Sequence, residues 1–313
     1  MSLARRLQEI EPFLAVEVAE RAQELERQGV DVVHLGYGEP DFAPPAVVQQ
    51  ALARAIAQGQ MRYTHSLGIL PLREAIADHY RATYGVKISP DQILVTPGTS
   101  PANPTGAVLA PERMAAVAAL AEEHGAFVVS DEIYHGLTEG GRDRSILEFT
   151  DRAFVLNGFS KAFAMTGWRL GYLIAPPSHV RALQRLYGNF FISTNEFVQW
   201  AGVAALREAA GEPARFARIF AERRRIMIDG LRAIGLGVGF EPSGAFYILA
   251  NARHLTADSL RFAYEILERS HVAVTPGVAF GRNAEGYLRF SYSASVERIH
   301  EGLRRLGAFL AAR

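Results

Sequence analysis

Apolar positions along the chain follow two patterns. Some recur every three to four residues, which predicts amphipathic helices, and others form short runs between them, which predict strands. Amphipathic helical patterns cover residues 12–28, 44–58, 69–84 and 111–124. A glycine follows directly after each of them, as expected where a helix stops. Short runs with strand composition lie at residues 93–95, 126–130, 153–157 and 169–175. Helices that alternate with strands in this way predict an α/β fold with a mainly parallel sheet covered by helices.

The pattern changes from about residue 213 onward. A long basic helical segment at 213–234 precedes strand patterns at 245–249 and 287–292 and helical patterns at 258–270 and 295–311. We therefore expect a large domain of residues 36–212. We also expect a smaller α+β domain, built from residues 1–35 together with 213–313.

Composition argues against several classes of function. The 313 residues carry 33 Lys and Arg against 33 Asp and Glu, and zero net charge argues against binding to nucleic acid or to an anionic membrane. No apolar run approaches the roughly 20 residues that span a bilayer, and no signal peptide is evident. The chain has no cysteine and no histidine pair with zinc spacing, which argues against a metal site. The lack of cysteine also fits a reducing, cytoplasmic location.

One loop combines a lysine with small residues and a nearby arginine. Lys161 follows a predicted strand and lies in a run rich in glycine, serine and alanine. A lysine in such a loop can have a lowered pKa, which suits Schiff-base chemistry. Arg169 could hold a phosphate with its guanidinium fork. On these residues alone, a solvated lysine and a structural ion pair are the favoured interpretation.

Three further segments change that balance. Residues 98–100, Gly-Thr-Ser, follow a predicted strand and offer amides and hydroxyls to a phosphate. Asn103 opens a tight Asn-Pro-Thr-Gly turn with an exposed amide. Asp131 stands at the carboxyl end of a predicted strand, where α/β sheets bind ligands. Tyr134 lies three residues later and would point the same way on one turn of helix.

Together these segments resemble the class I and II aminotransferases, pyridoxal-phosphate enzymes of the aspartate-aminotransferase fold, fold type I. The matching segments are residues 35–42, 63–68, 95–100, 101–106, 130–134, 158–171 and 287–292, in the order in which the family has them. The run from the serine–lysine pair to the arginine–leucine–glycine triplet is the most specific of these matches. The resemblance implies transfer of an amino group from an L-amino acid to a 2-oxo acid, by a ping-pong route through pyridoxamine phosphate.

The resemblance also implies a role for each matching residue in binding the cofactor. Lys161 would bind pyridoxal phosphate covalently and then carry the proton between substrate and cofactor. Asp131 would keep the pyridine nitrogen protonated, and Tyr134 and Asn103 would contact the ring oxygen. The residues expected to hold the phosphate are Arg169, Ser160, Thr99 and Ser100.

The substrate and a second subunit would be held by further residues of the same motifs. Arg289 would clamp the substrate α-carboxylate bidentately, with help from Asn103 and from the backbone amide of Gly38. Tyr63 would reach the phosphate of the neighbouring subunit, which implies a homodimer with shared active sites. The visible side-chain pocket is apolar, so we expect neutral or aromatic amino acids rather than aspartate as substrates.

Two other functions stay open from the sequence. The same cofactor on the same fold also supports other reactions, such as C–S bond cleavage, and fold does not fix the reaction. A catalytically silent binding module is the alternative from another class. The full set of Lys161, Asp131, Tyr134, Arg169 and Arg289 argues against a silent module.

The chain departs from the family at one point. In the family, a long stretch separates the glycine–hydroxyl loop from the Asn-Pro-Thr-Gly turn. It holds the helix behind the phosphate, further strands of the sheet and an aromatic residue that stacks on the pyridine ring. Here Ser100 is followed directly by Pro101. Either the segment belongs to the protein and is missing from view, or the polypeptide is truly shortened. We favour the first, because excision would strip strands from the sheet and expose apolar surface.

Overall fold

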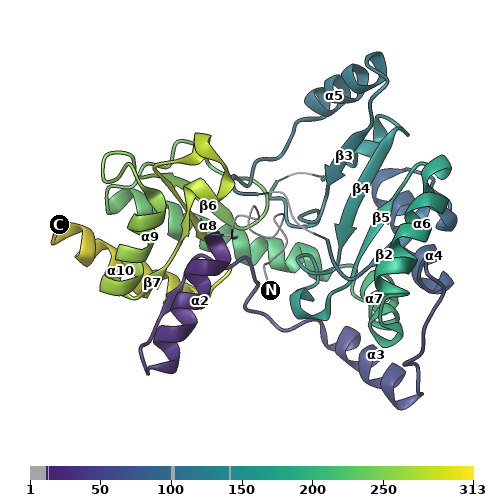
Figure 1. Cartoon of the computed structure of the whole chain (residues 1–313), viewed down its shortest axis with the longest axis horizontal. Coiled ribbons are helices and arrows are strands. Elements are labelled where there is room, and N and C mark those ends of the chain that lie inside the picture. Colours follow the sequence, from purple (N-terminus) through teal and green to yellow (C-terminus); the bar gives the residue numbers. More distant parts are fainter. Residues whose placement is uncertain (1–11, 13, 100–102, 141) are drawn as a thin grey trace, which may run out of the picture.

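The computed structural model describes residues 12, 14–99, 103–140 and 142–313. Figure 1 shows two groups of elements: the larger sheet and its helices, and a second group that combines α2 with the C-terminal third of the chain. Two separate clusters of buried apolar side chains correspond to these groups. No helix within the described residues has both the length and the apolar character that crossing a membrane requires.

The larger sheet has four strands in the order β2-β5-β4-β3. Their bounds are β2 Ile93–Thr96, β3 Val128–Asp131, β4 Ala153–Gly158 and β5 Gly171–Ile174. β3 and β4 are parallel, whereas β5 runs antiparallel to both β4 and β2. The α/β class is confirmed. The sheet is mixed rather than mainly parallel, because the reversed strand β5 lies inside it.

Five helices accompany this sheet in the described residues: α3 Ala46–Ala57, α4 Leu70–Tyr84, α5 Pro111–Glu123, α6 Pro177–Phe191 and α7 Glu196–Glu208. The ends of α3, α4 and α5 lie within two residues of the predicted ones, because proline and glycine mark them. Gly85, for example, ends α4 with a φ of 75°, a conformation that glycine adopts without strain. The sequence pattern did not predict α6 or α7.

The C-terminal part of the second group begins with the long helix α8, Glu212–Ala233. A three-stranded antiparallel sheet has the order β6-β9-β8, and β1 pairs in parallel with β7. The bounds are α2 Leu14–Arg27, β1 Val33–His34, β6 Tyr247–Asn251, α9 Ser259–Ser270, β7 Val272–Ala273, β8 Thr275–Pro276, β9 Tyr287–Ser291 and α10 Val296–Ala311. Pairing of β1 with β7 therefore joins the N-terminal part of the chain to its C-terminal third.

Five short 3₁₀ helices complete the described elements: η1 Pro90–Gln92, η2 Ile146–Glu148, η3 Thr166–Trp168, η4 Gly277–Phe280 and η5 Arg282–Ala284. Only η3 alters a prediction that concerns the site. The strand expected at 169–175 begins at Gly171, because η3 precedes it and Arg169 takes a left-handed conformation with φ 54°.

The larger sheet ends at β3, which pairs on one side only. Val129 on this strand is 67% exposed, and Leu120 on the neighbouring helix α5 is 58% exposed. Ser100 and Pro101 are consecutive in the full 313-residue sequence, so the segment is absent from the polypeptide. The expectation that this segment belongs to the protein and is only unseen is therefore wrong. Loss of the segment was expected to expose apolar surface at the sheet edge, and the exposed Val129 and Leu120 agree with this.

Candidate active site

Lys161 lies in the loop that follows β4, and a backbone hydrogen bond of 3.1 Å from Phe159 N to Leu170 O closes this loop. Its Nζ donates to the carbonyl oxygen of Gly38 at 2.6 Å. Nζ also lies 5.8 Å from the centre of the Phe246 ring. Both contacts are made with residues outside the larger sheet, so the Lys161 side chain lies where the two groups of elements meet.

The surroundings of Lys161 favour its neutral amine. Burial lowers the pKa of Lys161 from 10.5 to about 8. The carboxylate of Glu39 opposes this shift, whereas the positive charges of Arg169 and Arg289 add to it. A lysine with such a pKa can act as a nucleophile and as a base near neutral pH.

Three non-glycine residues around this loop have positive φ. They are Ala164 with φ 53°, Arg169 with φ 54° and Ala245 with φ 55°. Each such residue costs roughly 1–3 kcal/mol, and such strain concentrates at functional sites because the surrounding structure must hold it. Ala164 and Arg169 lie in the lysine loop, and Ala245 directly precedes Phe246.

Arg169 lies against the loop that follows β2. Its Nη1 donates to the Thr166 carbonyl at 2.9 Å and its Nη2 to the Pro97 carbonyl at 3.4 Å. A Cβ added to Gly98 would come within 2.4 Å of Nη2, so only glycine allows this approach. Arg169 is an exposed residue, so it can meet an anion from solution.

Two hydroxyl groups of the same region lack partners. Ser160 Oγ and Thr99 Oγ1 are buried and form no hydrogen bond with the described residues. A buried hydroxyl without a partner is costly, so such groups point to a ligand that is held there. Thr99 lies close to Gly171, which directly follows the lysine loop. Ser100, the fourth residue expected in this region, lies outside the described residues.

Asp131 is the last residue of β3, and Tyr134 lies in the turn that follows. Asp131 Oδ1 accepts a hydrogen bond of 3.1 Å from the Ile133 amide. The expected turn of helix at this point is a hydrogen-bonded turn instead. A cavity of about 700 Å³ is lined by both residues, by Asn103 and by residues 104–111.

The Tyr134 hydroxyl donates to Tyr247 Oη at 3.1 Å. Burial raises the pKa of Tyr134 well above 10, and the neighbouring Tyr247 and Asp131 act in the same direction while Arg289 opposes them. Tyr134 therefore stays a neutral phenol that can donate a hydrogen bond.

Tyr247, on β6, is a site residue that the sequence reasoning missed. A Cβ added to Gly38 would lie 1.8 Å from the Tyr247 hydroxyl, so Gly38 packs directly on it. The Tyr247 ring lies 4.2 Å from the guanidinium carbon of Arg289. Tyr247 thus contacts Gly38, Tyr134 and Arg289 at once. Its only signal in the sequence was its place in a predicted strand.

Arg289 is held in the middle of β9 and is only 5% exposed. Its Nη1 donates to Asn103 Oδ1 at 2.7 Å, and its Nη2 donates to the Gly36 carbonyl at 2.6 Å and to Thr275 Oγ1 at 3.0 Å. Burial lowers its pKa. None of the carboxylates in the described residues forms an ion pair with it. A buried cation without an anion is costly, so a carboxylate ligand fits this position.

Tyr63 lies apart from these residues and is 79% exposed. Its neighbours Arg62 and Thr64 donate backbone hydrogen bonds to Glu196 and to Ser193. The structure thus brings Lys161, Gly38, Tyr134, Asn103 and Arg289 into one connected set through Tyr247, and leaves Tyr63 on the surface.

Comparisons with known proteins agree over the whole length of the chain. The family model described as aminotransferase class I and II matches residues 30–102 and 99–306. The chain is 34% identical to the aspartate/prephenate aminotransferase of Thermus thermophilus, over 98% of each chain. It is 32% identical to the (5-formylfuran-3-yl)methyl phosphate transaminase of Methanocaldococcus jannaschii, over 98% of this chain and 99% of that protein. A crystal structure of an aminotransferase from Mycobacterium tuberculosis matches with a TM-score of 0.93 at 31% identity, over 100% of both chains.

The same comparisons locate the missing segment. The alignment with the Thermus protein runs over 383 positions, whereas this chain has 313 residues. Both ends of the two proteins are aligned, so the unmatched positions are internal. The two matches of the family model meet at residues 99–102. The chain therefore lacks an internal segment that its relatives have, at the point where the sequence motifs predicted it.

Proposed function

This chain belongs to the class I and II aminotransferases, which are pyridoxal-phosphate-dependent transaminases, and we propose that the residues around Lys161 hold the cofactor in it. Its substrates are accordingly an amino acid and a 2-oxo acid. The named relatives are transaminases, and none of the reported observations favours C–S bond cleavage or a silent module.

The residues present fit the phosphate end of the cofactor. Ser160 Oγ and Thr99 Oγ1 are buried without partners, and phosphate oxygens accept hydrogen bonds from hydroxyl groups. Arg169 lies against Gly98, the residue before Thr99, and supplies a positive charge there. Asp131 is proposed to pair with the ring nitrogen, and Tyr134 and Asn103 to donate to the ring oxygen. When bound, pyridoxal phosphate supplies an electron sink for charge that develops on the substrate.

Lys161 is proposed as the group that attaches to the cofactor and moves the proton. Because burial lowers its pKa to about 8, roughly a tenth of the amine is neutral at pH 7, far more than for a free lysine. Its bond to the Gly38 carbonyl fixes the direction of Nζ. The amide of Gly38 was expected to face the substrate, and in this structure its carbonyl oxygen faces Lys161.

Arg289 is proposed to bind the substrate α-carboxylate. Asn103, Gly36 and Thr275 already orient the guanidinium, so little conformational entropy is lost when a carboxylate arrives. The Tyr247 ring supports one face of it. A planar fork held in this way favours bidentate recognition.

A homodimer with shared sites is also proposed. Large apolar side chains are exposed around the segment that carries Tyr63: Met61 60%, Tyr63 79%, Phe190 72%, Phe191 55% and Ile192 50%. Exposed apolar groups gathered in one region favour a protein interface.

The proposed location, the cytoplasm, rests on the lack of cysteine. The proposed domains, 36–212 and 1–35 with 213–313, are supported by the two apolar clusters.

The observation that carries this proposal is the pair of buried hydroxyls without partners in the described part of the chain. Ser160 directly precedes Lys161, and Thr99 directly follows Gly98, against which Arg169 lies. To test it, the protein is mixed with pyridoxal phosphate, reduced with borohydride, digested and analysed by mass spectrometry. We expect the cofactor on Lys161, and no label there in Lys161→Ala. Label spread over other amines, or none, would contradict the proposal.

Turnover is then measured with alanine, leucine, phenylalanine and aspartate as amino donors. Amino transfer that is lost in Lys161→Ala is expected. Activity on aspartate far above that on the other three would contradict the expected preference for neutral or aromatic substrates.

A further inference from the structure

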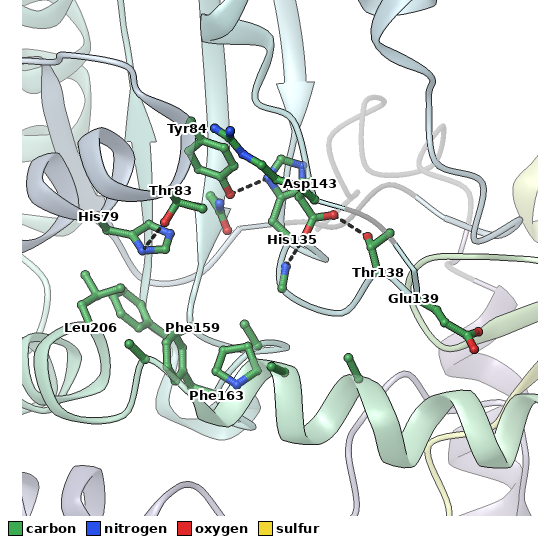
Figure 2. Close-up of a pocket in the computed structure, with 18 of the residues that line it drawn as sticks. His79, Thr83, Tyr84, His135, Thr138, Glu139, Asp143, Phe159, Phe163 and Leu206 are labelled. Carbon is green, nitrogen blue, oxygen red and sulfur yellow. Dashed lines mark hydrogen bonds between the residues drawn. The ribbon is translucent and has the colours of Figure 1, made fainter.

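A second cavity, of about 810 Å³, adjoins the first and shares residues such as His135 and Asp143 with it, but none of the residues proposed above to hold cofactor or substrate. Figure 2 shows it between α4, the loop that follows β3 and the helix α8. We call it the α8 cavity. Its volume lies within the roughly 300–1,000 Å³ of small-molecule sites in proteins.

The floor of the α8 cavity is apolar and belongs to the lysine loop. Phe159 and Phe163 line it, two residues before and two residues after Lys161. Their ring centres are 5.8 Å apart, and Tyr172 packs against Phe159 at 6.0 Å. Leu206 completes this surface. Such a floor suits a flat or branched apolar group.

The wall formed by α8 is lined by small residues and by arginines. Ala214, Ala217 and Ala221 leave room in front of the floor. Arg218 and Arg225 lie seven residues apart, on the same face of the helix. Neither forms an ion pair with any described residue.

The acidic residues of the α8 cavity, by contrast, are engaged within the protein. Asp143 accepts a hydrogen bond of 2.6 Å from the Gly136 amide and another from the Thr138 hydroxyl. Glu139 is paired with Arg224. The charge of Glu139 is offset by Arg224, and the oxygens of Asp143 are taken up by neighbouring donors. Arg218 and Arg225 have no such partner among the residues that the structure describes, so this side of the cavity favours a negative charge.

Two histidines add donors on the opposite wall, and each uses one ring nitrogen internally. His79 Nδ1 is 3.3 Å from Thr83 Oγ1, and His135 Nδ1 is 2.9 Å from the hydroxyl of Tyr84. Neither Nε2 atom forms a hydrogen bond with the described residues. Figure 2 shows both imidazoles at the cavity, on the side away from α8.

We propose that the α8 cavity binds a small carboxylate with an apolar, aromatic-sized body. The body lies on Phe159, Phe163 and Tyr172, and the carboxylate meets Arg218 or Arg225. The arginine fork matches two carboxylate oxygens, and the long side chains reach the cavity from its rim. This site is separate from the proposed substrate site at Arg289, and its occupancy does not depend on the transaminase reaction.

The test is a calorimetric titration of the pyridoxal-phosphate-treated protein with 3-phenylpropanoate. In Ala217→Trp the added ring fills the cavity, and we expect binding at least ten times weaker. Glu222→Trp, on the same helix but outside the cavity, is the matched control and should bind within twofold of the parent protein. Circular dichroism checks that both variants are folded.

A second set of titrations tests the charge. Arg218→Gln/Arg225→Gln should weaken binding of 3-phenylpropanoate about tenfold and leave the neutral 3-phenylpropanamide unaffected. Equal binding of acid and amide to the parent protein would overturn the assignment to a carboxylate, as would tighter binding of phenyl phosphate. Binding that survives Ala217→Trp but is lost in Arg289→Lys would belong to the substrate site, and would overturn the proposal. Absence of any binding would overturn it as well.

Discussion

β3 and β9 each carry a charged residue of the candidate site, but their surroundings differ. Asp131 ends β3, which pairs with β4 alone and has Val129 67% exposed. Arg289 lies inside β9, between β6 and β8, where residues 288–291 are all buried. The segment that the relatives have and this chain lacks would follow residue 100, so its loss bears on the larger sheet and leaves the smaller one complete.

The different pairing of β3 and β9 affects two functions of the site, binding of the cofactor and binding of the substrate. The proposed carboxylate clamp rests on a sheet that is paired on both sides of β9, which restricts its motion. The residue proposed for the cofactor ring rests on an edge strand, where pairing is weaker and local opening costs less. We therefore expect substrate recognition to be the more robust half of the site, and cofactor retention the weaker half.

The largest expected effect is on stability in the smaller sheet. Phe290→Ala removes a fully buried ring from β9 and should lower the free energy of unfolding by about 3–5 kcal/mol. The matched change Phe127→Ala lies just before the edge strand, where the ring is 39% exposed. It should cost about 1 kcal/mol. Urea unfolding followed by circular dichroism measures both, and equal losses would refute the comparison.

A somewhat smaller effect is expected on substrate binding. Arg289→Lys keeps the charge but loses the planar fork that Asn103, Gly36 and Thr275 orient. The lysine ammonium can still donate to one carboxylate oxygen, so one charge-assisted hydrogen bond of about 1.5–3 kcal/mol is lost, which should lower kcat/KM by roughly 10–10²-fold. Steady-state kinetics measures this. The cofactor affinity of Arg289→Lys should remain that of the parent, and a parallel loss of cofactor would show that the two halves of the site are not separable.

The pH dependence of Lys161 should show the depressed pKa directly. Only the neutral amine attacks a carbonyl, so attachment of the cofactor should rise with pH and reach its half-maximal rate near pH 8. The sign follows from burial, which favours the neutral form and releases the proton earlier than in free lysine. Rates of borohydride trapping from pH 6 to 12 test it. A midpoint near 10.5, the ordinary lysine value, would mean that Lys161 is solvated.

The smallest effect is expected at the sheet edge itself. Val129→Lys places a charge on the exposed outer edge of β3 and should change the free energy of unfolding by no more than about 0.5 kcal/mol. Because lysine on an edge strand discourages pairing with other chains, the variant should stay in solution at higher concentration. Light scattering against concentration measures this. Unchanged self-association together with a large loss of stability would mean that β3 is covered in solution.

Local signals account for what the sequence predicted well. Proline at the start and glycine at the end fixed α3, α4 and α5 to within two residues, because these residues act on the backbone whatever packs around it. The motifs taken together indicated the cofactor chemistry through their resemblance to the family, whereas the residues around Lys161 alone did not. The expected break after Ser100 was also readable from the sequence, because two motifs that a long segment separates in the family are adjacent here.

Tertiary contacts decided the rest. The place of Tyr247 beneath Arg289 and against Gly38 joins residues far apart in the sequence, and no local pattern encodes such a contact. The reversal of β5 inside the larger sheet depends on how the strands pair, which the periodicity of a single strand does not record. The lowered pKa of Lys161 follows from burial by the folded chain. The sequence thus determined which residues form the site and what chemistry they can perform. The contacts, protonation and exposure of these residues depend on segments that are distant in the sequence and meet only in the folded chain.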